Sequence, residues 1–289
     1  MCFTRDTNRK RRSWPPRWLG AATARRAYYS GLDHSYLLYP LDRAITLKTS
    51  IQALVRRLRD SGHNAVGHPE ETVGVAMLLS SAGGFLDAFT WLGHGGVFAN
   101  AQTGNVVLLG IYAASGQWEK SLRHVPPILA FLIGVFVAFR LRLHESRQSR
   151  ERTALLSLGI EIGFLLVVAM LPRHFPDLPI VLGVAFLAAL QSTSFAKVEG
   201  SPYSSVMTTG NLRRTAELLF AGVFPPGDAV ALYQSRLFAM VCCSFAVGAC
   251  AGGFATAKAG NHGVLLPALA LLLALVQCLQ RRGSDKTRA

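Results

Sequence analysis

Long apolar runs separated by short polar segments dominate the chain from Val73 onward. Each run is about 20 residues long, which is the length of helix that crosses a hydrocarbon core of about 30 Å. Helices also satisfy their own backbone hydrogen bonds where no water is present. The sequence therefore predicts an all-α polytopic membrane protein with six transmembrane helices. The runs occupy residues 73–92, 125–143, 154–171, 178–196, 237–256 and 263–280.

The distribution of charge adds an orientation to this prediction. The chain has 30 Lys and Arg residues and a net charge of +14. If the N-terminus is cytoplasmic, the only basic residues between the runs on the outer side are Lys120, Arg123, Arg173 and Lys258. Because cytoplasmic loops are enriched in Lys and Arg, we expect both termini in the cytoplasm and the protein in the cell (inner or plasma) membrane. No nucleic-acid-binding motif accompanies the charge, so we expect no nucleic-acid partner.

Residues 1–72 form a separate, Arg-rich segment without a run of spanning length. We do not expect a secretory signal, because no apolar stretch follows the basic start. Apolar residues at 51, 54, 55 and 58 have helical spacing, and such a helix can lie on an anionic membrane surface. The favoured interpretation is a solvated, disordered extension, followed by a membrane domain over residues 73–289.

The second half of the membrane domain repeats the pattern of the first. Each half contains an apolar run, the tripeptide Thr-Gly-Asn, a short apolar stretch and two further runs, over residues 73–171 and 178–280. Three is an odd number, so the two repeats must cross the membrane in opposite directions. Inverted repeats of this kind build many secondary transporters, with substrate sites where helices are broken near the midplane. The tripeptides, called the TGN segments below, are Thr103, Gly104 and Asn105, and Thr209, Gly210 and Asn211.

Two interpretations of the TGN segments remain open. Glycine adopts backbone conformations that other residues resist, and Thr and Asn side chains can bind free amides where a helix begins. From Val106 to Ala114 such a helix would be about 14 Å long, half of a bilayer. The segments are either re-entrant half-helices whose N-termini face a solute, or capped helices in ordinary interfacial loops.

Polar residues inside the predicted spans are candidates for a solute or ion pathway. They include Asp87, Glu161 and Gln191, the last at the start of a polar run over 191–194. An acid in hydrocarbon costs roughly 3 kcal/mol or more, so it usually faces a cavity or a partner. The functional hypothesis is that one or both of Asp87 and Glu161 carry a coupling proton or cation, and the alternative is a structural hydrogen bond to a neighbouring helix. The hydroxyls of the run can bond their own helix, which leaves Gln191 to reach a partner.

Two pairs of glycines at GxxxG spacing predict close packing between helices. Gly159 and Gly163 flank Glu161, and Gly248 and Gly252 lie in the fifth run. We expect both pairs to lie against a neighbouring helix.

The sequence shows no constellation of residues for catalysis or metal binding. No HExxH, GxSxG or Walker A motif is found. The five Cys and eight His residues show no ligand spacing. We therefore expect no enzymatic activity, no cofactor and no bound metal.

The stretch AGGFLDAFTWLGHGGVFANAQTGNVVLLG, which contains the first TGN segment, resembles the signature of the YoaK family of bacterial membrane proteins. The second-half stretches ALQSTSFAKVEG and SSVMTTGNLRR resemble a second signature of that family. The resemblance covers roughly residues 73–280. It implies a six-span integral membrane protein whose domain has no assigned function or substrate.

The leading functional hypothesis is a secondary transporter or permease for a small solute, coupled to protons or uncoupled. The alternative from another class is a membrane scaffold or sensor subunit that moves nothing, and a third is an intramembrane enzyme. Arg213 and Arg214, after the second TGN segment, are expected at the inner headgroups, with binding of an anionic solute as the alternative. The bilayer and an unidentified small solute are the expected partners. The oligomeric state, a homo-oligomer included, stays open.

Overall fold

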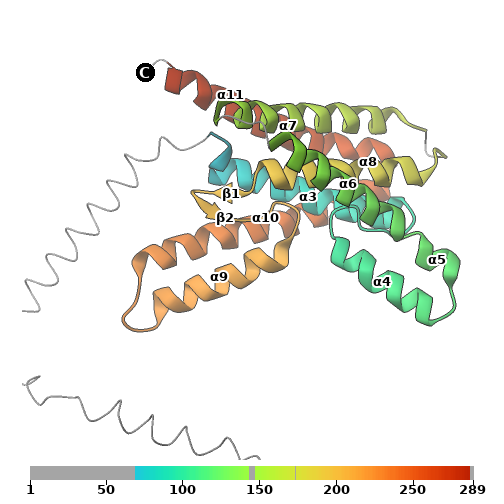
Figure 1. The fold of residues 1–289 in the computed structure, drawn as a ribbon, viewed down its shortest axis with the longest axis horizontal. Coiled ribbons are helices and arrows are strands. Elements are labelled where there is room, and N and C mark those ends of the chain that lie inside the picture. Colours follow the sequence, from blue (N-terminus) through green and yellow to red (C-terminus); the bar gives the residue numbers. More distant parts are fainter. Residues whose placement is uncertain (1–68, 143–146, 173, 287–289) are drawn as a thin grey trace, which may run out of the picture. The chain divides into compact units, whose positions relative to one another are not determined.

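The structure is a computed structural model that describes residues 69–142, 147–172 and 174–286, almost all of them helical (Figure 1). Apart from residues 69–72, the predicted N-terminal extension lies outside the described residues. In chain order the elements are η1 Pro69–Glu71, α3 Val73–Gly93, α4 Gln102–Ala114, α5 Trp118–Leu122, α6 Val125–Arg142, α7 Arg147–Met170, α8 Asp177–Ser194, β1 Lys197–Val198, β2 Ser201–Pro202, α9 Thr208–Val223, α10 Ala229–Ala259, η2 Gly260–Val264 and α11 Leu265–Lys286.

Five helical segments of the described chain are long and apolar enough to cross a membrane. Four of them coincide with single predicted runs, whereas the fifth, of 54 residues, contains both runs predicted at 237–256 and 263–280. The chain thus has the helices of a multi-pass membrane protein. The segments are Val73–Gly93, Trp118–Leu141, Glu151–Met170, Asp177–Ser194 and Ala229–Arg282.

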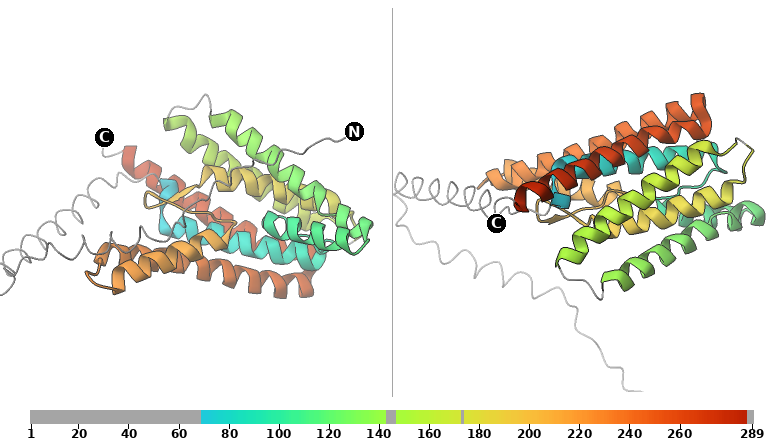
Figure 2. Two further views of the ribbon diagram at one scale, coloured as in Figure 1. Left: turned by 60° about the horizontal axis from the view of Figure 1, so that its bottom comes forward. Right: turned by 90° about the horizontal axis from the view of Figure 1, so that it is seen from above.

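The 54-residue segment contains α10, η2 and most of α11, and α10 and α11 run in opposite directions. The backbone of α10 lies against Ser81 of α3 at Gly248 and against Phe85 at Gly252, so α10 runs parallel to α3. The side chain of Gln277 in α11 then lies beside the first turn of α3, so the chain has turned back. Figure 2 shows the long helices aligned along a common direction.

The chain reverses its direction between α10 and α11 in η2, which is hydrogen-bonded to the C-terminal end of α7. The amide nitrogen of Asn261 donates to the carbonyl oxygen of Leu171 at 3.3 Å. Nδ1 of His262 lies 2.7 Å from the carbonyl oxygen of Ala169. These contacts hold the end of repeat one against the turn between the last two helices of repeat two.

Only one of the two GxxxG pairs packs as predicted. Methyl groups built on Gly248 and Gly252 would overlap the backbone of α3, which confirms the close approach expected there. In contrast, no described heavy atom other than the neighbouring backbone lies within 4 Å of a methyl group on Gly159 or Gly163. The prediction that Gly159 and Gly163 pack against another helix is therefore wrong. A GxxxG pair can pack closely only if a second helix lies against the face that carries the two glycines. In α7 the face that meets the neighbouring helices carries other residues, such as Leu158 and Leu165.

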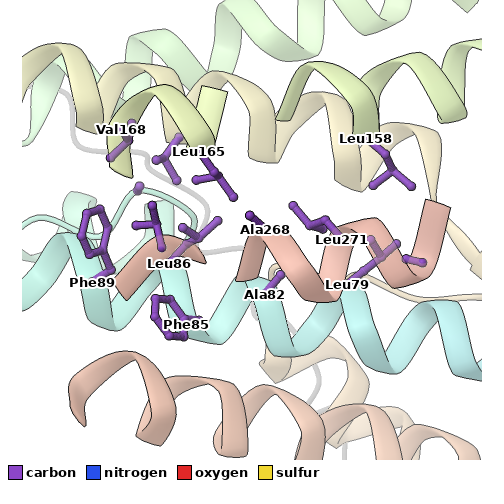
Figure 3. Close-up of a cluster of buried hydrophobic side chains, with 14 of the residues drawn as sticks. Leu79, Ala82, Phe85, Leu86, Phe89, Leu158, Leu165, Val168, Ala268 and Leu271 are labelled. Carbon is purple, nitrogen blue, oxygen red and sulfur yellow. The ribbon is translucent and has the colours of Figure 1, made fainter. Parts of the chain in front are cut away.

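The main core lies between α3, α7, α8 and α11. Figure 3 shows side chains of α3 in contact with those of α7 and α11 in this core. The labelled members are Leu79, Ala82, Phe85, Leu86 and Phe89 from α3, Leu158, Leu165 and Val168 from α7, and Ala268 and Leu271 from α11. They are all buried, so the apolar faces of three helices from both repeats form one core.

The helices of residues 73–171 and those of residues 178–280 make corresponding contacts. The first helix of repeat one, α3, packs on α10 and α11, the last two helices of repeat two. The first helix of repeat two, α8, packs on α6 and α7, the last two long helices of repeat one. The two third helices, α7 and α11, contact each other. Helices of the first half of the membrane domain thus pack against helices of the second half.

Candidate functional site

Each TGN segment begins a short helix, and its asparagine binds the loop that precedes the helix. Oδ1 of Asn105 accepts a bond from the backbone N–H of Phe98 at 3.2 Å, and Nδ2 donates to the Phe98 carbonyl at 2.5 Å. Asn211 makes the same pair of bonds to Ser204, at 3.2 and 2.6 Å. In both repeats the partner lies seven residues earlier, and both asparagines are buried.

The two asparagines do not bind the amides that the sequence predicted. The prediction had Thr and Asn binding free amides at the helix start, but the amides bound lie in the preceding loop. Among the described residues, no side-chain bond caps α4 at Ala101 or α9 at Met207. At the start of α4 the backbone carbonyls of Asn100 and Ala101 accept bonds from the N–H groups of Gln102 and Gly104 at 3.1 and 2.9 Å instead.

The starts of α4 and α9 meet at one cavity of about 990 Å³ beside α3 and α10. In Figure 1 the two helices diverge from this region, α9 to one side and α4 to the other. Of the predicted site residues, the cavity is lined by Asp87, Thr103, Thr209, Gly210 and Asn211. The structure does not place Gly104, Asn105, Glu161 or Gln191 in its lining. The cavity thus joins the acid of repeat one to both TGN segments.

Asp87 lines the cavity and is hydrogen-bonded to the loop before α4. Its side chain is only 6% exposed. Oδ1 accepts bonds from the backbone N–H groups of Asn100 at 2.9 Å and Ala101 at 3.2 Å. The side chain of Asn100 in turn donates to the Gly83 carbonyl at 2.9 Å. One carboxylate oxygen therefore fixes the loop, while Oδ2 takes part in none of these bonds.

Aromatic residues form another part of the cavity wall. The rings of Trp91 and Phe98 stack with their centroids 4.5 Å apart. Tyr203 lies between β2 and α9 and is 8% exposed. Burial raises the pKa of the Tyr203 phenol, so the hydroxyl keeps its proton. Aromatic residues therefore make up part of the cavity wall.

Two arginines of α9 complete the charged lining. Nε of Arg213 lies 3.7 Å from a carboxylate oxygen of Glu217, and both side chains are largely exposed. Within the described ranges, no acid forms an ion pair with Arg214. The charged residues that line the cavity are thus one acid, Asp87, and two bases.

Glu161 and Gln191 are buried away from this cavity. The side chains are 3% and 1% exposed, and neither Oε2 of Glu161 nor Nε2 of Gln191 has a hydrogen-bond partner in the described part of the chain. The hydroxyls of Ser192 and Thr193 bond the Ala189 carbonyl of their own helix at 3.2 and 2.7 Å, as the sequence predicted. A pathway role for Glu161 and Gln191 stays a prediction.

We expect Glu161→Gln to leave the protein at least as stable as the wild type. The amide has the same shape and spares the cost of keeping a carboxylate away from water, about 1 kcal/mol or more, which corresponds to a rise of about 2–4 °C in the unfolding midpoint. Thermal unfolding of the purified protein measures this. A fall of several degrees would instead show that Glu161 holds a partner that glutamine cannot hold.

Sequence reasoning missed the aromatic residues of the wall, namely Trp91, Phe98 and Tyr203. One of them was detectable. Aligning the two repeats on their TGN segments places Phe98 opposite Ser204, a difference between an aromatic and a small polar residue at equivalent positions. Trp91 and Tyr203 follow no pattern that marks them, because their places depend on how α3 and α9 pack.

The helices, the cavity and the buried acid define a multi-pass membrane protein with a polar cavity beside both TGN segments. The chain belongs to the family described as "Protein of unknown function (DUF1275)", which matches residues 75–277. It is also similar to the UPF0700 transmembrane protein YoaK of Bacillus subtilis (strain 168), with 25% identity over 151 residues, which are 51% of this chain and 67% of that protein. The resemblance noted in the sequence is thereby confirmed. No solved structure matches the chain.

Proposed function

We propose that the protein is a secondary transporter for a small solute, with Asp87 carrying a coupling proton or cation. The observation behind this proposal is the single cavity that Asp87 shares with both TGN segments. Pockets that combine apolar walls with a few convergent polar groups are the usual sites of small ligands. A buried acid in such a place fits a coupling role better than a structural one, because one of its oxygens is not used by the backbone.

The helix contacts support an inverted repeat. If each helix is replaced by its counterpart in the other repeat, the pair α3–α10 becomes α8–α6 and the pair α3–α11 becomes α8–α7. The pair α7–α11 stays the same. All of these contacts occur. The matching bonds of Asn105 and Asn211 extend the correspondence to single atoms. Two interlocked repeats of this kind are the architecture in which one repeat rocks against the other around a fixed site.

The proposal includes six crossings with both termini in the cytoplasm, and this arrangement supports it. A segment of 54 residues is too long for one crossing, since about 20 residues suffice. The reversal at η2 divides it into two, α10 parallel to α3 and α11 antiparallel to it. In the orientation favoured by the basic residues, the odd-numbered crossings then lead outward and the even-numbered ones inward.

The test is uptake of small polar solutes into proteoliposomes under an imposed pH gradient, with Asp87→Asn as the variant. Asparagine keeps an Oδ1 acceptor for the amides of Asn100 and Ala101, so the loop is expected to stay in place. We expect gradient-driven uptake to fall at least about tenfold, because the exchangeable charge is lost.

Asp228→Asn is the matched control for this experiment. Oδ1 of Asp228 accepts a bond from the Val230 N–H at 2.8 Å at the start of α10, outside the cavity, and asparagine caps a helix equally well. Its uptake should equal that of the wild type. Unchanged uptake and pH dependence in Asp87→Asn would remove the coupling role. Absence of flux for every solute tested with the wild type would favour the scaffold or sensor alternative.

A further inference from the structure

The acid of the cavity has one oxygen that the protein itself does not use. Asp87 is 6% exposed, and the backbone amides of Asn100 and Ala101 both bind its Oδ1. Oδ2 accepts no hydrogen bond from the described residues, and it is not among their enclosed side-chain atoms without a partner. Because Asp87 lines the cavity, this oxygen is open to the cavity. A carboxyl group so far from bulk water binds either a proton or a cation.

Two stacked aromatic rings lie in the same part of the cavity wall. Trp91 follows Asp87 by four residues in α3, so the two side chains lie on one face of the helix, one turn apart. Trp91 stacks on Phe98 with the ring centroids 4.5 Å apart. Phe98 precedes Asn100 by two residues, and Asn100 is bound to Asp87. The carboxylate therefore holds the loop that supplies the second ring.

The ring of Phe98 is fixed on the start of α4. Asn105 binds both backbone groups of Phe98, and a methyl group built on Gly104 would lie 2.6 Å from the ring. At the second TGN segment Ser204 takes the place of Phe98, and no described heavy atom outside the neighbouring backbone lies within 4 Å of a methyl group on Gly210. The first TGN segment thus provides a preformed aromatic wall, which loses little freedom when a ligand binds.

The composition of the cavity wall indicates which kind of cation fits. Metal ions such as Mg²⁺ and Ca²⁺ require about six oxygen ligands or more, whereas the described lining contains one acid and several aromatic and aliphatic side chains. A volume of about 990 Å³ accommodates an organic molecule. A protonated amine can donate an N–H to a carboxylate oxygen, and the faces of aromatic rings attract the same charge.

The two basic residues of the lining lie in a different environment from the acid. Arg213 and Arg214 are exposed, and Nε of Arg213 lies 3.7 Å from a carboxylate oxygen of Glu217. Water and salt screen charges in exposed positions, whereas an enclosed charge is screened much less. Asp87 therefore determines the charge that a ligand needs in the enclosed part of the cavity.

We infer that the cavity binds small organic cations. An N–H of a protonated amine donates to Oδ2 of Asp87, and the apolar body of the molecule lies against Trp91 and Phe98. The inference deepens the proposed function, because the cation that Asp87 carries is then the solute itself. It rests on that proposal for the movement of the amine, whereas binding is measurable without transport.

Equilibrium dialysis of the full-length protein in neutral detergent tests the charge of the ligand. The radiolabelled probes are 2-naphthylmethylamine, 2-naphthylmethanol and 2-naphthoate, which share one ring system and are cationic, neutral and anionic. Empty micelles serve as the blank. We expect the amine to bind at least about tenfold more tightly than the other two. Absence of amine binding, equal binding of amine and alcohol, or a preference for naphthoate would each overturn the inference.

Variants test the two parts of the site. Asp87→Asn keeps the Oδ1 acceptor but removes the charge, so it should weaken amine binding at least about tenfold and leave alcohol binding unchanged. Trp91→Leu should reduce the preference for the amine over the alcohol about threefold, and Trp91→Phe should restore part of it. The matched controls Asp228→Asn and Trp118→Leu alter exposed residues outside the lining and should bind as the wild type does. Amine binding by Asp87→Asn equal to that of the wild type would contradict the site.

Uptake measurements separate this inference from the proposed function. Amine binding without flux of any solute would leave the site standing and remove the transport proposal. Flux of another solute that depends on Asp87, together with no amine binding, would remove the organic-cation site and leave the transport proposal standing. Because the three probes are compared on the wild type, a variant that fails to fold does not prevent the decision.

Discussion

Replacing Gly248 with alanine is expected to separate α3 from α10 and to destabilise the protein strongly. The added carbon would overlap the carbonyl oxygen of Ser81, a backbone atom that no side-chain rotation can move. Overpacking of this kind costs typically about 1–3 kcal/mol and more where the backbone itself must shift. We expect a much lower yield of monodisperse protein in size-exclusion chromatography and a lower unfolding midpoint in detergent.

A control for this prediction lies on the same helix. A methyl group on Gly253 would come no closer than 3.7 Å to the Leu92 side chain, an ordinary van der Waals contact. Gly253→Ala should therefore unfold at the midpoint of the wild type or slightly above it, because alanine favours a helix over glycine. Equal midpoints for Gly248→Ala and Gly253→Ala would mean that the two helices do not approach each other as closely as described.

Removing either TGN asparagine is expected to have the second large effect. Asn211→Ala leaves both the N–H and the carbonyl of Ser204 without their partner, and Asn105→Ala does the same to Phe98. An unsatisfied buried group costs about 1–3 kcal/mol, so each variant should lose about 2–5 kcal/mol. Asn105 also lies 3.2 Å from Nδ1 of His124, so its loss should be the larger of the two. Denaturant or thermal unfolding measures both.

Asn261→Ala serves as the comparison, because within the described residues its side chain makes one longer bond, of 3.3 Å to the Leu171 carbonyl. Its loss should be about 1 kcal/mol. If the TGN variants cost no more than Asn261→Ala, the asparagines do not hold the loops before α4 and α9. The two repeats would then share a sequence motif without a shared structural role.

Much of the candidate site could be predicted from the sequence. Asp87 was identifiable because an acid is rare inside an apolar span, and the TGN segments because a tripeptide recurs at the same place in two repeats. The wall of the cavity could not be predicted in this way. Trp91 and Phe98 are common apolar residues in a membrane protein, and only their stacking beside the start of α4 makes them part of the site. Conversely, Glu161 has the same sequence signal as Asp87 but lies outside the cavity.

The two asparagines show a similar division. Their recurrence predicted a shared role where a helix begins, and both do make the same bonds. Which backbone they bind was not predictable, because the partner lies seven residues earlier in a loop whose course depends on α3 and α10. The difference between Gly104 and Gly210 has the same origin. Two identical tripeptides acquire different surroundings because one residue in the preceding loop is a phenylalanine in one repeat and a serine in the other.

The sequence by itself determined the apolar helices, their approximate limits and the division into two similar halves. These depend on local composition, since about 20 apolar residues suffice for a helix that can cross a membrane, whatever lies beside it. Only the tertiary structure decided which helix of one half packs on which helix of the other, which glycines touch a neighbouring backbone and which polar residues share a cavity. Those outcomes depend on contacts between residues far apart in the chain, and hydropathy along the sequence carries no record of them.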